Sequence, residues 1–276
     1  MPPRRHPILL LIASALFFGA AFFTVRFPDT PGAGAGSFIS TLLIALPSFV
    51  AVWRYLGPRS AALSLLSVSV FGYAIETTGV ITGFPYGAFY YGDSLGPRVA
   101  GLVPYLLPLS WVPLVLGSVA ATAPARAPTG KLLRRRALWV LYAAVLLTLV
   151  DVVLDPGAVS LGFWVYPEGG PYYGVPVTNF LGWLLSSSLA AAILLALGRR
   201  EWDSVPPPPD LLDSAVIAVA FWVGVAVFSG LLFPAVVGVA LFVYLLRCGA
   251  RLAVLAMAGG ARYNGGGDDD RWRSKV

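Results

Sequence analysis

Long apolar stretches, separated by short polar or glycine-rich segments, recur along the chain. A helix that crosses a membrane needs about 20 predominantly apolar residues. The pattern therefore predicts an all-α membrane protein, a polytopic bundle of about eight transmembrane helices, with soft boundaries at 7–25, 37–55, 60–81, 99–122, 137–155, 178–197, 211–229 and 231–250. The last two stretches are separated only by about Gly230, so they form either a tight hairpin or one broken element, and seven or eight crossings stay open.

The basic residues set the expected orientation of these helices. With the N-terminus inside, the inner segments hold 17 of the 19 Lys and Arg residues, and the outer segments hold only Arg26 and Arg98. Cytoplasmic segments are enriched in Lys and Arg, so we expect an even number of crossings of the cell membrane, with both termini cytoplasmic. The first stretch has the basic start of a signal peptide but no clear A-x-A cleavage site, so we interpret it as a helix.

Composition agrees with this pattern and narrows the chemistry. The chain of 276 residues is 58% hydrophobic and 12% charged, about half the charged fraction usual in soluble domains. We expect one transmembrane domain at 1–263 with its core at 60–250, and a disordered cytoplasmic tail at 264–276. The pI near 9.6 reflects the topology signals, so no nucleic acid partner is expected. The single Cys248 and single His6 argue against an intrachain disulfide, a Cys/His zinc site or a Ser-His-Asp triad in the membrane core.

Segments rich in glycine, proline and aromatic residues predict the connections between helices. PGAGAG at 31–36 is expected to be an outer turn, and VPPPPD at 205–210 a stiff inner connector in polyproline geometry. Two long outer segments, 82–97 and 161–174, are rich in Tyr, Trp, Gly and Pro. Simple linkers have little use for so many aromatic residues, so these two segments are candidates for a functional role.

The two aromatic segments also resemble each other. Glu76 lies seven residues before Gly83, and Asp155 lies seven residues before Gly162. Each segment then reaches a Tyr, followed by a Tyr-Tyr-Gly sequence. This spacing indicates a degenerate internal repeat, in which the third and fourth helices correspond to the fifth and sixth. Chance similarity between two aromatic loops is the alternative, and superposition of the two helix pairs would decide between them.

Three acidic residues lie in apolar stretches rather than in turns or tails: Glu76, Asp151 and Asp155. Asp151 and Asp155 share one helical face because they are four residues apart. The expected topology places Glu76, and Asn179 at the start of the next helix, at the same depth. A charged side chain at mid-membrane costs about 2.5–3.5 kcal/mol on insertion scales, and less near the interface. Capping of helix ends, or pairing with Arg98 or Asn179, is one explanation, and a functional site under the aromatic loops is the other.

Carboxyl groups and aromatic rings, with little His or Cys, suit acid chemistry on an alkene. A buried carboxyl beside a second carboxylate holds its proton more readily and can donate it, while the ionised neighbour orients a water molecule. Aromatic faces stabilise a cation where the dielectric is low. These residue types predict protonation of a C=C bond, a tertiary cation and its capture by water, on a lipid that enters sideways from the bilayer. No metal is expected.

The blocks ETTGVITGFPYGAFYYGDSLGP, VLDPGAVSLGFWVYP and GGPYYGVPVTNFLGW resemble the multi-pass carotenoid hydratase family, over about residues 60–250 and most densely at 72–113 and 151–183. The resemblance implies hydration of a terminal trisubstituted C=C bond of a long polyene to a tertiary alcohol, without a cofactor. In the haloarchaeal branch, bisanhydrobacterioruberin becomes bacterioruberin, and in a bacterial branch gamma-carotene is hydrated at its 1',2' bond. The Ala/Val-rich helices and the GGGDDD tail favour the haloarchaeal branch.

The sequence allows roles to be assigned to individual residues. One of Asp151 and Asp155 is the proton donor, and Asp155 is preferred because it lies nearer the aromatic loops. The other aspartate, or Glu76, orients the water, and Asn179 either holds water or a carboxyl or is a plain N-cap. Six aromatic residues are expected to line the substrate pocket, unless they only form an interfacial belt: Tyr86, Tyr90, Tyr91, Trp164, Tyr172 and Tyr173. The expected partners are the carotenoid in the bilayer and other enzymes of its pathway.

Other function classes stay open. Intramembrane acids and a repeat also suit a lipid or proton-coupled transporter. The D-x-x-x-D string in DVVLD is faintly like the acidic motifs of membrane prenyltransferases, but only one such string is present and the adjoining loop lacks Lys and Arg. A carotenoid-binding scaffold without activity is a further alternative. Product analysis separates these classes, because only a hydratase adds the mass of water to its substrate.

Overall fold

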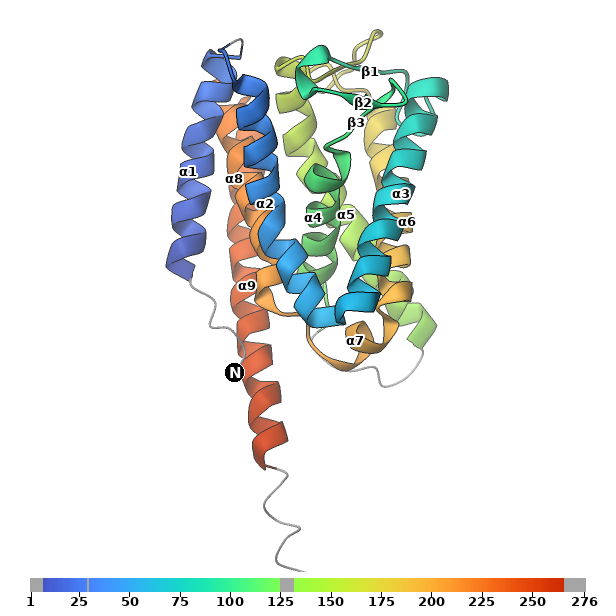
Figure 1. Ribbon diagram of the computed structural model, residues 1–276, viewed down its shortest axis with the longest axis vertical. Helices are drawn as coiled ribbons and strands as arrows, with labels where there is room; N and C mark the ends of the chain where they lie inside the picture. Colours follow the sequence, from blue (N-terminus) through green and yellow to red (C-terminus); the bar gives the residue numbers. More distant parts are fainter. Residues whose placement is uncertain (1–6, 29, 125–131, 266–276) are drawn as a thin grey trace, which may run out of the picture.

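The chain folds into a bundle of long helices (Figure 1). The computed structural model describes residues 7–28, 30–124 and 132–265. The α-helices of this part are α1 (Pro7–Arg26), α2 (Ala33–Leu56), α3 (Pro58–Thr82), α4 (Leu107–Ala121), α5 (Leu132–Ser160), α6 (Val177–Leu197), the short α7 (Arg199–Ser204), α8 (Asp213–Phe228) and α9 (Leu232–Gly265). Seven helical segments are long and apolar enough to cross a membrane, and α4 is a shorter apolar helix. The all-α, polytopic membrane fold predicted from the sequence is therefore confirmed.

α4 departs most from its expected boundaries. The stretch predicted as a helix at 99–122 is helical only from Leu107 to Ala121, and the residues before it form a hairpin of β2 (Arg98–Val99) and β3 (Val103–Pro104). Every residue of α4 from Trp111 onward is buried, because α2, α3, α5 and α8 surround this helix. Irregular backbone at membrane depth is tolerated where protein covers it, so α4 does not need the length of a lipid-facing helix.

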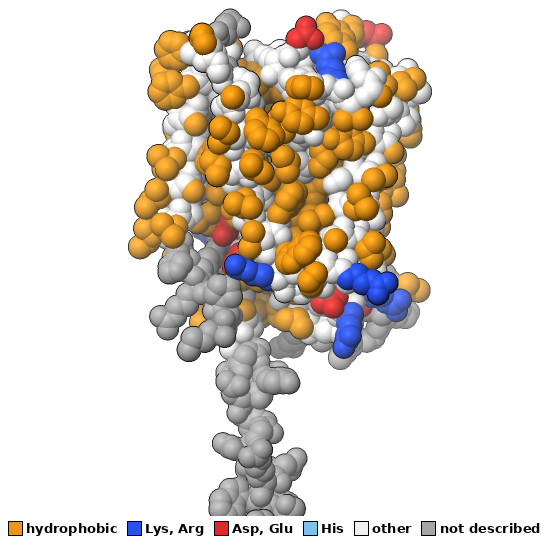
Figure 2. Space-filling model, in the orientation of Figure 1, with side chains coloured by type: hydrophobic (Ala, Val, Ile, Leu, Met, Phe, Trp, Pro, Cys, Tyr) orange, Lys and Arg blue, Asp and Glu red, His pale blue; other side chains and the backbone are white. Residues whose placement is uncertain are grey.

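The two ends of the bundle differ in charge. The start of α1 and the described end of α9 lie toward the same end as α7 and the turn between α2 and α3, which we call the basic end (Figure 1). On the face shown in Figure 2, most of the Lys and Arg side chains gather there, and apolar side chains cover the sides of the bundle. This distribution agrees with lipid contact around the sides and with basic connections on one side of a membrane.

The two aromatic loops meet at the opposite end, which we call the aromatic end. β1 (Tyr90–Tyr91) of the first loop pairs antiparallel with β4 (Trp164–Val165) of the second, and the 3-10 turn η1 (Asp93–Leu95) follows β1. A glycine with left-handed backbone follows the helix before each loop, Gly83 at φ 76° directly after α3 and Gly162 at φ 67° two residues after the end of α5. Glycine adopts this conformation without the steric cost of a Cβ. These matching turns support the internal repeat, which stays a prediction until the helix pairs are superposed.

Three other boundaries differ from the sequence-based expectation. α2 begins at Ala33, inside the stretch expected to be an outer turn at 31–36. In the connector expected at 205–210, Pro208 has extended backbone angles, but the 3-10 helix η2 (Pro209–Leu212) already begins at the next residue. α9 continues through Gly265, so the first two residues of the expected tail are helical, and 266–276 lie outside the described residues.

α5 runs through Pro156 and ends at Ser160, whereas the sequence predicts that it ends at Asp155. A proline inside a helix lacks the N–H that would bond the carbonyl four residues earlier, which here is the carbonyl of Val152. The hydroxyl of Tyr172 donates to that carbonyl at 3.0 Å. The second aromatic loop thus replaces the missing helical hydrogen bond, and Asp155 lies within the helix rather than at its end.

Candidate active site

Four polar side chains meet inside the bundle, below the aromatic loops. Glu76 lies on α3, Asp151 and Asp155 lie on α5, and Asn179 lies on α6, with exposed fractions of 9%, 0%, 1% and 1%. Electrostatic interactions link Glu76 to both aspartates. The structure therefore brings together the three acids and the asparagine that the sequence singles out. We call these four residues the carboxyl cluster.

Asp151 and Asp155 form a pair that shares one amide group. Nδ2 of Asn179 donates to Oδ2 of Asp151 at 2.9 Å and also to Oδ2 of Asp155. The two carboxyl groups also interact with each other electrostatically, and two neighbouring buried carboxyl groups favour a state in which one of them holds a proton. Asn179 is not the N-cap of α6, because Pro176 holds that position. The pair is thus arranged as an acid beside its conjugate base.

The two aspartates differ in their other hydrogen bonds. The hydroxyl of Tyr166 donates to Oδ2 of Asp155 at 3.1 Å, and the indole of Trp164 also donates to Asp155. Burial, followed by the nearby Asp155 carboxyl, raises the pKa of Tyr166 well above its usual value, so this hydroxyl keeps its proton and stays a donor. By contrast, Oδ1 of Asp151 is buried and accepts no hydrogen bond from any residue that the structure describes.

Glu76 has hydrogen-bond donors of its own. The hydroxyl of Tyr91 donates to Oε2 of Glu76 at 2.7 Å, and the hydroxyl of Tyr86 bonds to the same carboxyl group. Ser186 of α6 hydrogen-bonds in turn to Tyr86. Burial, reinforced by the neighbouring Glu76, raises the pKa of both tyrosines well above the usual value. Both tyrosines are therefore neutral donors. Glu76 is a second hydrogen-bonded carboxyl site beside the aspartate pair.

A layer of rings covers the carboxyl cluster toward the aromatic end. The ring of Phe89 is central, since its centroid lies 6.0 Å from that of Tyr86, 5.4 Å from that of Tyr91 and 6.0 Å from that of Tyr166. None of these four residues is more than 9% exposed. Trp164 extends the layer, at 6.2 Å from Tyr91. The rings separate the acids from solvent at this end of the bundle.

Not all of the expected lining residues reach the cluster. Tyr90 and Tyr173 are 52% and 42% exposed, so their side chains point away from the interior. Adjacent residues of a strand face opposite sides, and buried Tyr91 therefore turns Tyr90 outward. Tyr172 lies beside the cluster, where its ring packs against that of Tyr173 at 5.2 Å and partial burial raises its pKa to about 12. Of the expected set, Tyr86, Tyr91 and Trp164 bond to the acids directly.

Three residues of the cluster's surroundings are not among the candidates selected from the sequence: Tyr166, Phe89 and Ser186. Tyr166 has a sequence signal, because it takes the place of Tyr86 in the expected repeat. Phe89 and Ser186 have none, since a phenylalanine in an aromatic loop and a serine in an apolar helix each have many ordinary explanations. Only the packing of the two loops on α6 shows their role.

Two glycines make room for the ring of Tyr86. A Cβ on Gly79 of α3 would lie 2.8 Å from this ring, and a Cβ on Gly182 of α6 would lie 2.6 Å from it. Both distances are too short for carbon atoms that are not bonded to each other. The ring therefore fits between α3 and α6 only because both positions lack a side chain, and the fit directs its hydroxyl toward Glu76.

The chemistry available to this cluster is proton transfer. Two interacting carboxyl groups and a third carboxyl bonded to two phenols, under a covering layer of rings, can deliver a proton to a ligand and accept one from water. Within the described ranges, no group of three or more His, Cys, Asp and Glu side chains is arranged to hold a metal ion.

Comparison with known proteins places this arrangement in a family. The family model described as carotenoid biosynthesis protein matches residues 35–245, which include the whole carboxyl cluster. The bisanhydrobacterioruberin hydratase of Haloarcula japonica is 38% identical over 204 residues, which cover 68% of the chain. The match spans 63% of that relative's length. No solved structure matches the chain. The protein belongs to the carotenoid biosynthesis protein family.

Proposed function

We propose that this protein is a carotenoid hydratase, which adds water to the terminal trisubstituted C=C bonds of a long polyene. Its family and the name of its relative from Haloarcula japonica support this reaction class. The observation that carries the proposal is the aspartate pair, in which two buried carboxyl groups share the amide of Asn179 and interact with each other. The proposed substrate is bisanhydrobacterioruberin, with bacterioruberin as the product, and gamma-carotene is the alternative within the family.

The first step is protonation of the C=C bond, and the hydrogen bonds favour Asp151 as the donor. Its Oδ1 accepts no hydrogen bond from a described residue, so in this proposal Oδ1 is the oxygen that carries the proton to the ligand. Asp155 instead accepts hydrogen bonds from its neighbours, which suits the ionised partner. The sequence favours Asp155 because it lies nearer the loops, but the sequence does not show these bonds. Transfer of the proton to the less substituted carbon breaks the π bond and leaves a tertiary cation.

The second step is capture of this cation by water. A water molecule held near Glu76 attacks the cationic carbon and forms the C–O bond, and its released proton returns to the carboxylates. One C=C bond and one water thus give one tertiary alcohol, and the aspartate pair regains its proton. The rings of Phe89, Tyr86 and Tyr166 stabilise the cation through their faces, and they keep bulk water from the acids. The polyene reaches the site from the bilayer of the cell membrane.

The proposal is tested by producing the protein in a host that accumulates bisanhydrobacterioruberin and measuring the masses of the pigments. The expected result is new pigment that is heavier by one or two waters. Unchanged pigment mass, with folded protein in the membrane, would contradict the hydratase assignment. A change only in where the pigment is found would point to a transporter instead.

Substitution of the aspartates tests the mechanism in the same host. General acid–base catalysis contributes about 10²–10⁴-fold to a rate, so Asp151→Asn and Asp155→Asn should each lower hydration by roughly that factor. Asparagine keeps the size of the side chain and one acceptor oxygen. The matched control is Asp93→Asn, because Asp93 is a fully exposed residue of the first loop that pairs with Arg98. Hydration by folded Asp151→Asn at the wild-type rate would remove Asp151 from its role.

A further inference from the structure

Two further buried polar atoms without hydrogen-bond partners lie between the carboxyl cluster and the basic end. Among the described residues, the hydroxyl oxygens of Ser64 and Ser187 are buried and have no hydrogen-bond partner. Ser64 is 0% exposed and Ser187 is 1% exposed. A buried polar group without a partner costs about 1–3 kcal/mol, and ordered water commonly satisfies such groups. Neither serine belongs to the carboxyl cluster, so their hydroxyls need another explanation.

The two serines lie on neighbouring helices, between the carboxyl cluster and the basic end. α3 carries Ser64 and α6 carries Ser187, and these helices pack side by side (Figure 1). With a rise of about 1.5 Å per residue, Ser187 lies about 12 Å below Asn179 on α6. By the same rise, Ser64 lies about 18 Å below Glu76 on α3. The two hydroxyls thus lie at successive depths on the two helices that form the seam between α3 and α6.

At the basic end, a hollow of about 620 Å³ lies beside the ends of both helices. Ser60 and Leu197 line this hollow, together with Arg199, Glu201 and Asp203 of α7. Ser60 is one helical turn below Ser64 on α3, and Leu197 is the last residue of α6. The hollow therefore reaches solvent close to the lower of the two serines.

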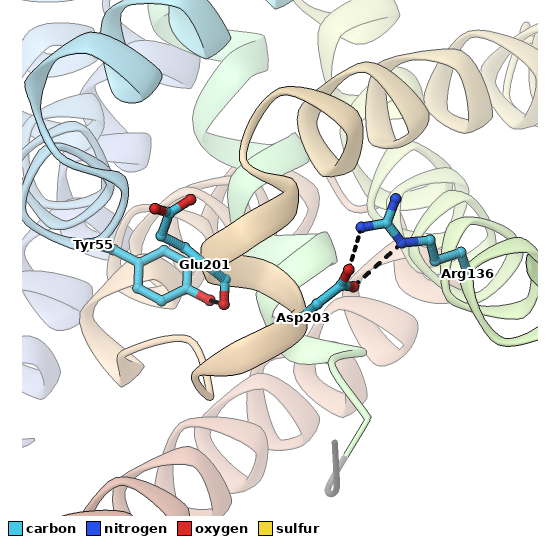
Figure 3. A network of polar contacts seen from close by, with 4 residues as sticks. All are labelled: Tyr55, Arg136, Glu201 and Asp203. Atoms are coloured by element: carbon cyan, nitrogen blue, oxygen red, sulfur yellow. Dashed lines mark hydrogen bonds and ion pairs between the residues drawn. The ribbon is translucent and has the colours of Figure 1, made fainter. Parts of the chain in front are cut away.

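Contacts of α7 hold the mouth of the hollow in place (Figure 3). Asp203 forms an ion pair with Arg136 of α5 at 2.6 Å, and the hydroxyl of Tyr55 on α2 donates to the carbonyl of Glu201 at 3.1 Å. Both anchors lie on helices other than α3 and α6. The short helix is thereby fixed to α2 and α5.

At its upper end the seam joins a series of hydrogen bonds that ends at an acid. Ser186 is the neighbour of Ser187 and bonds to the hydroxyl of Tyr86, which bonds to Glu76. On the other side of Glu76, the buried rings of Phe89 and Tyr91 separate the cluster from solvent. Water that enters from the basic end would therefore reach the acids and stop there.

We propose that a hydrated path runs along the seam between α3 and α6, from the hollow at Ser60 past Ser64 and Ser187 to Glu76. The path supplies the acids with water and protons from the basic end of the bundle. This use rests on the proposed hydration reaction, which consumes one water for each C=C bond. The presence of water along the seam does not depend on that reaction. Experiments can therefore contradict the hydrated path and the hydratase assignment independently.

Cysteine labelling tests the path directly. Cys248 is the chain's single cysteine, so Cys248→Ala gives a background without thiols, and Ser64→Cys and Ser187→Cys are introduced into it. A thiol reacts as the thiolate, which needs water to form. In membrane vesicles, a small cationic methanethiosulfonate reagent should label both cysteines at least about tenfold faster than the control cysteines described next, and only when added from the basic end.

The matched controls are Ser69→Cys and Ser188→Cys in the same background. Ser69 and Ser188 lie on the same two helices, but they are partly exposed on the sides of the bundle, and their hydroxyls donate to backbone carbonyls at 2.6 Å and 2.7 Å. Labelling of Ser64→Cys and Ser187→Cys at the control rate, or only from the aromatic end, would overturn the path. Labelling is measured without carotenoid, so a failed hydratase assay leaves this result intact.

A measurement on the unmodified protein covers the case in which a cysteine variant does not fold. Hydroxyl radicals generated by X-rays modify side chains that lie beside bound water. Leu194 is 1% exposed and lies two turns below Ser187 on the same face of α6, whereas Leu189 is 44% exposed on the apolar side of the bundle. In membranes, we expect Leu194 to be modified more than Leu189. Modification of Leu189 alone would contradict the path.

Discussion

Replacement of Tyr166 by phenylalanine isolates a single hydrogen bond of the carboxyl cluster. The hydroxyl donates to Oδ2 of Asp155 at 3.1 Å, and the side chain is 8% exposed. Tyr166→Phe keeps the ring and its contact with Phe89, at 6.0 Å between centroids, and removes only the donor. In the proposed reaction, the aspartate pair changes from one negative charge to two as Asp151 releases its proton. A donor to this pair therefore bonds more strongly in the transition state than before it.

The magnitude follows from the kind of bond that is lost. Hydrogen bonds to charged groups contribute about 1.5–3 kcal/mol. Only the part of this energy that the bond gains in the transition state affects the rate, and each 1.36 kcal/mol of barrier is about tenfold in rate. Tyr166→Phe should therefore slow hydration measurably, by up to about 150-fold. The loss should appear in the rate of conversion of bound pigment rather than in the amount of pigment bound, since the hydroxyl bonds to an acid and not to the polyene.

The assay is a time course of pigment mass in membranes that hold equal amounts of folded protein. The control is Tyr73→Phe, which also removes a hydroxyl near the aromatic end. That hydroxyl donates at 2.7 Å to the backbone carbonyl of Tyr105, so the control should hydrate at the wild-type rate. If Tyr166→Phe hydrates as fast as Tyr73→Phe, Asp155 is not the ionised partner of the pair, and the mechanism must be redrawn.

Two further predictions concern the scaffold. Gly182→Ala should destabilise the fold by about 1–3 kcal/mol, the usual cost of overpacking, because its Cβ would lie 2.6 Å from the Tyr86 ring. The control Gly19→Ala should not destabilise the fold, because nothing lies within 4 Å of its Cβ. Thermal unfolding in detergent measures both, and equal effects would show that the ring yields easily. Arg136→Ala and Asp203→Ala should show a coupling energy of about 1 kcal/mol in a double-mutant cycle, since their 2.6 Å ion pair is mostly shielded from solvent. Strictly additive effects on the unfolding free energy would show that this pair does not anchor α7.

The hydrogen-bond partners of the acids show how far sequence reasoning reaches into the site. The sequence selects Glu76, Asp151, Asp155 and Asn179, and these residues come together in the interior. It favours Asp155 as the proton donor because of its position along the helix, whereas the bonds around the pair favour Asp151. Which carboxyl accepts a hydrogen bond from a tyrosine, and which has an oxygen without a donor, depends on side-chain rotamers and on the positions of loops. The sequence determines neither.

The sequence by itself determines the membrane fold. The length of each apolar stretch and the positions of the charged residues decide which segments enter the membrane, and neither depends on tertiary contacts. The cost of placing a carboxylate in lipid likewise marks Glu76, Asp151 and Asp155 directly in the sequence. Tertiary structure decides the rest. α4 is short because other helices surround it, α5 continues through Pro156 because Tyr172 bonds the freed carbonyl, and Tyr91 covers the acids while Tyr90 faces outward because β1 pairs with β4. Each of these outcomes depends on contacts between segments far apart in the chain, and no local pattern of residues encodes them.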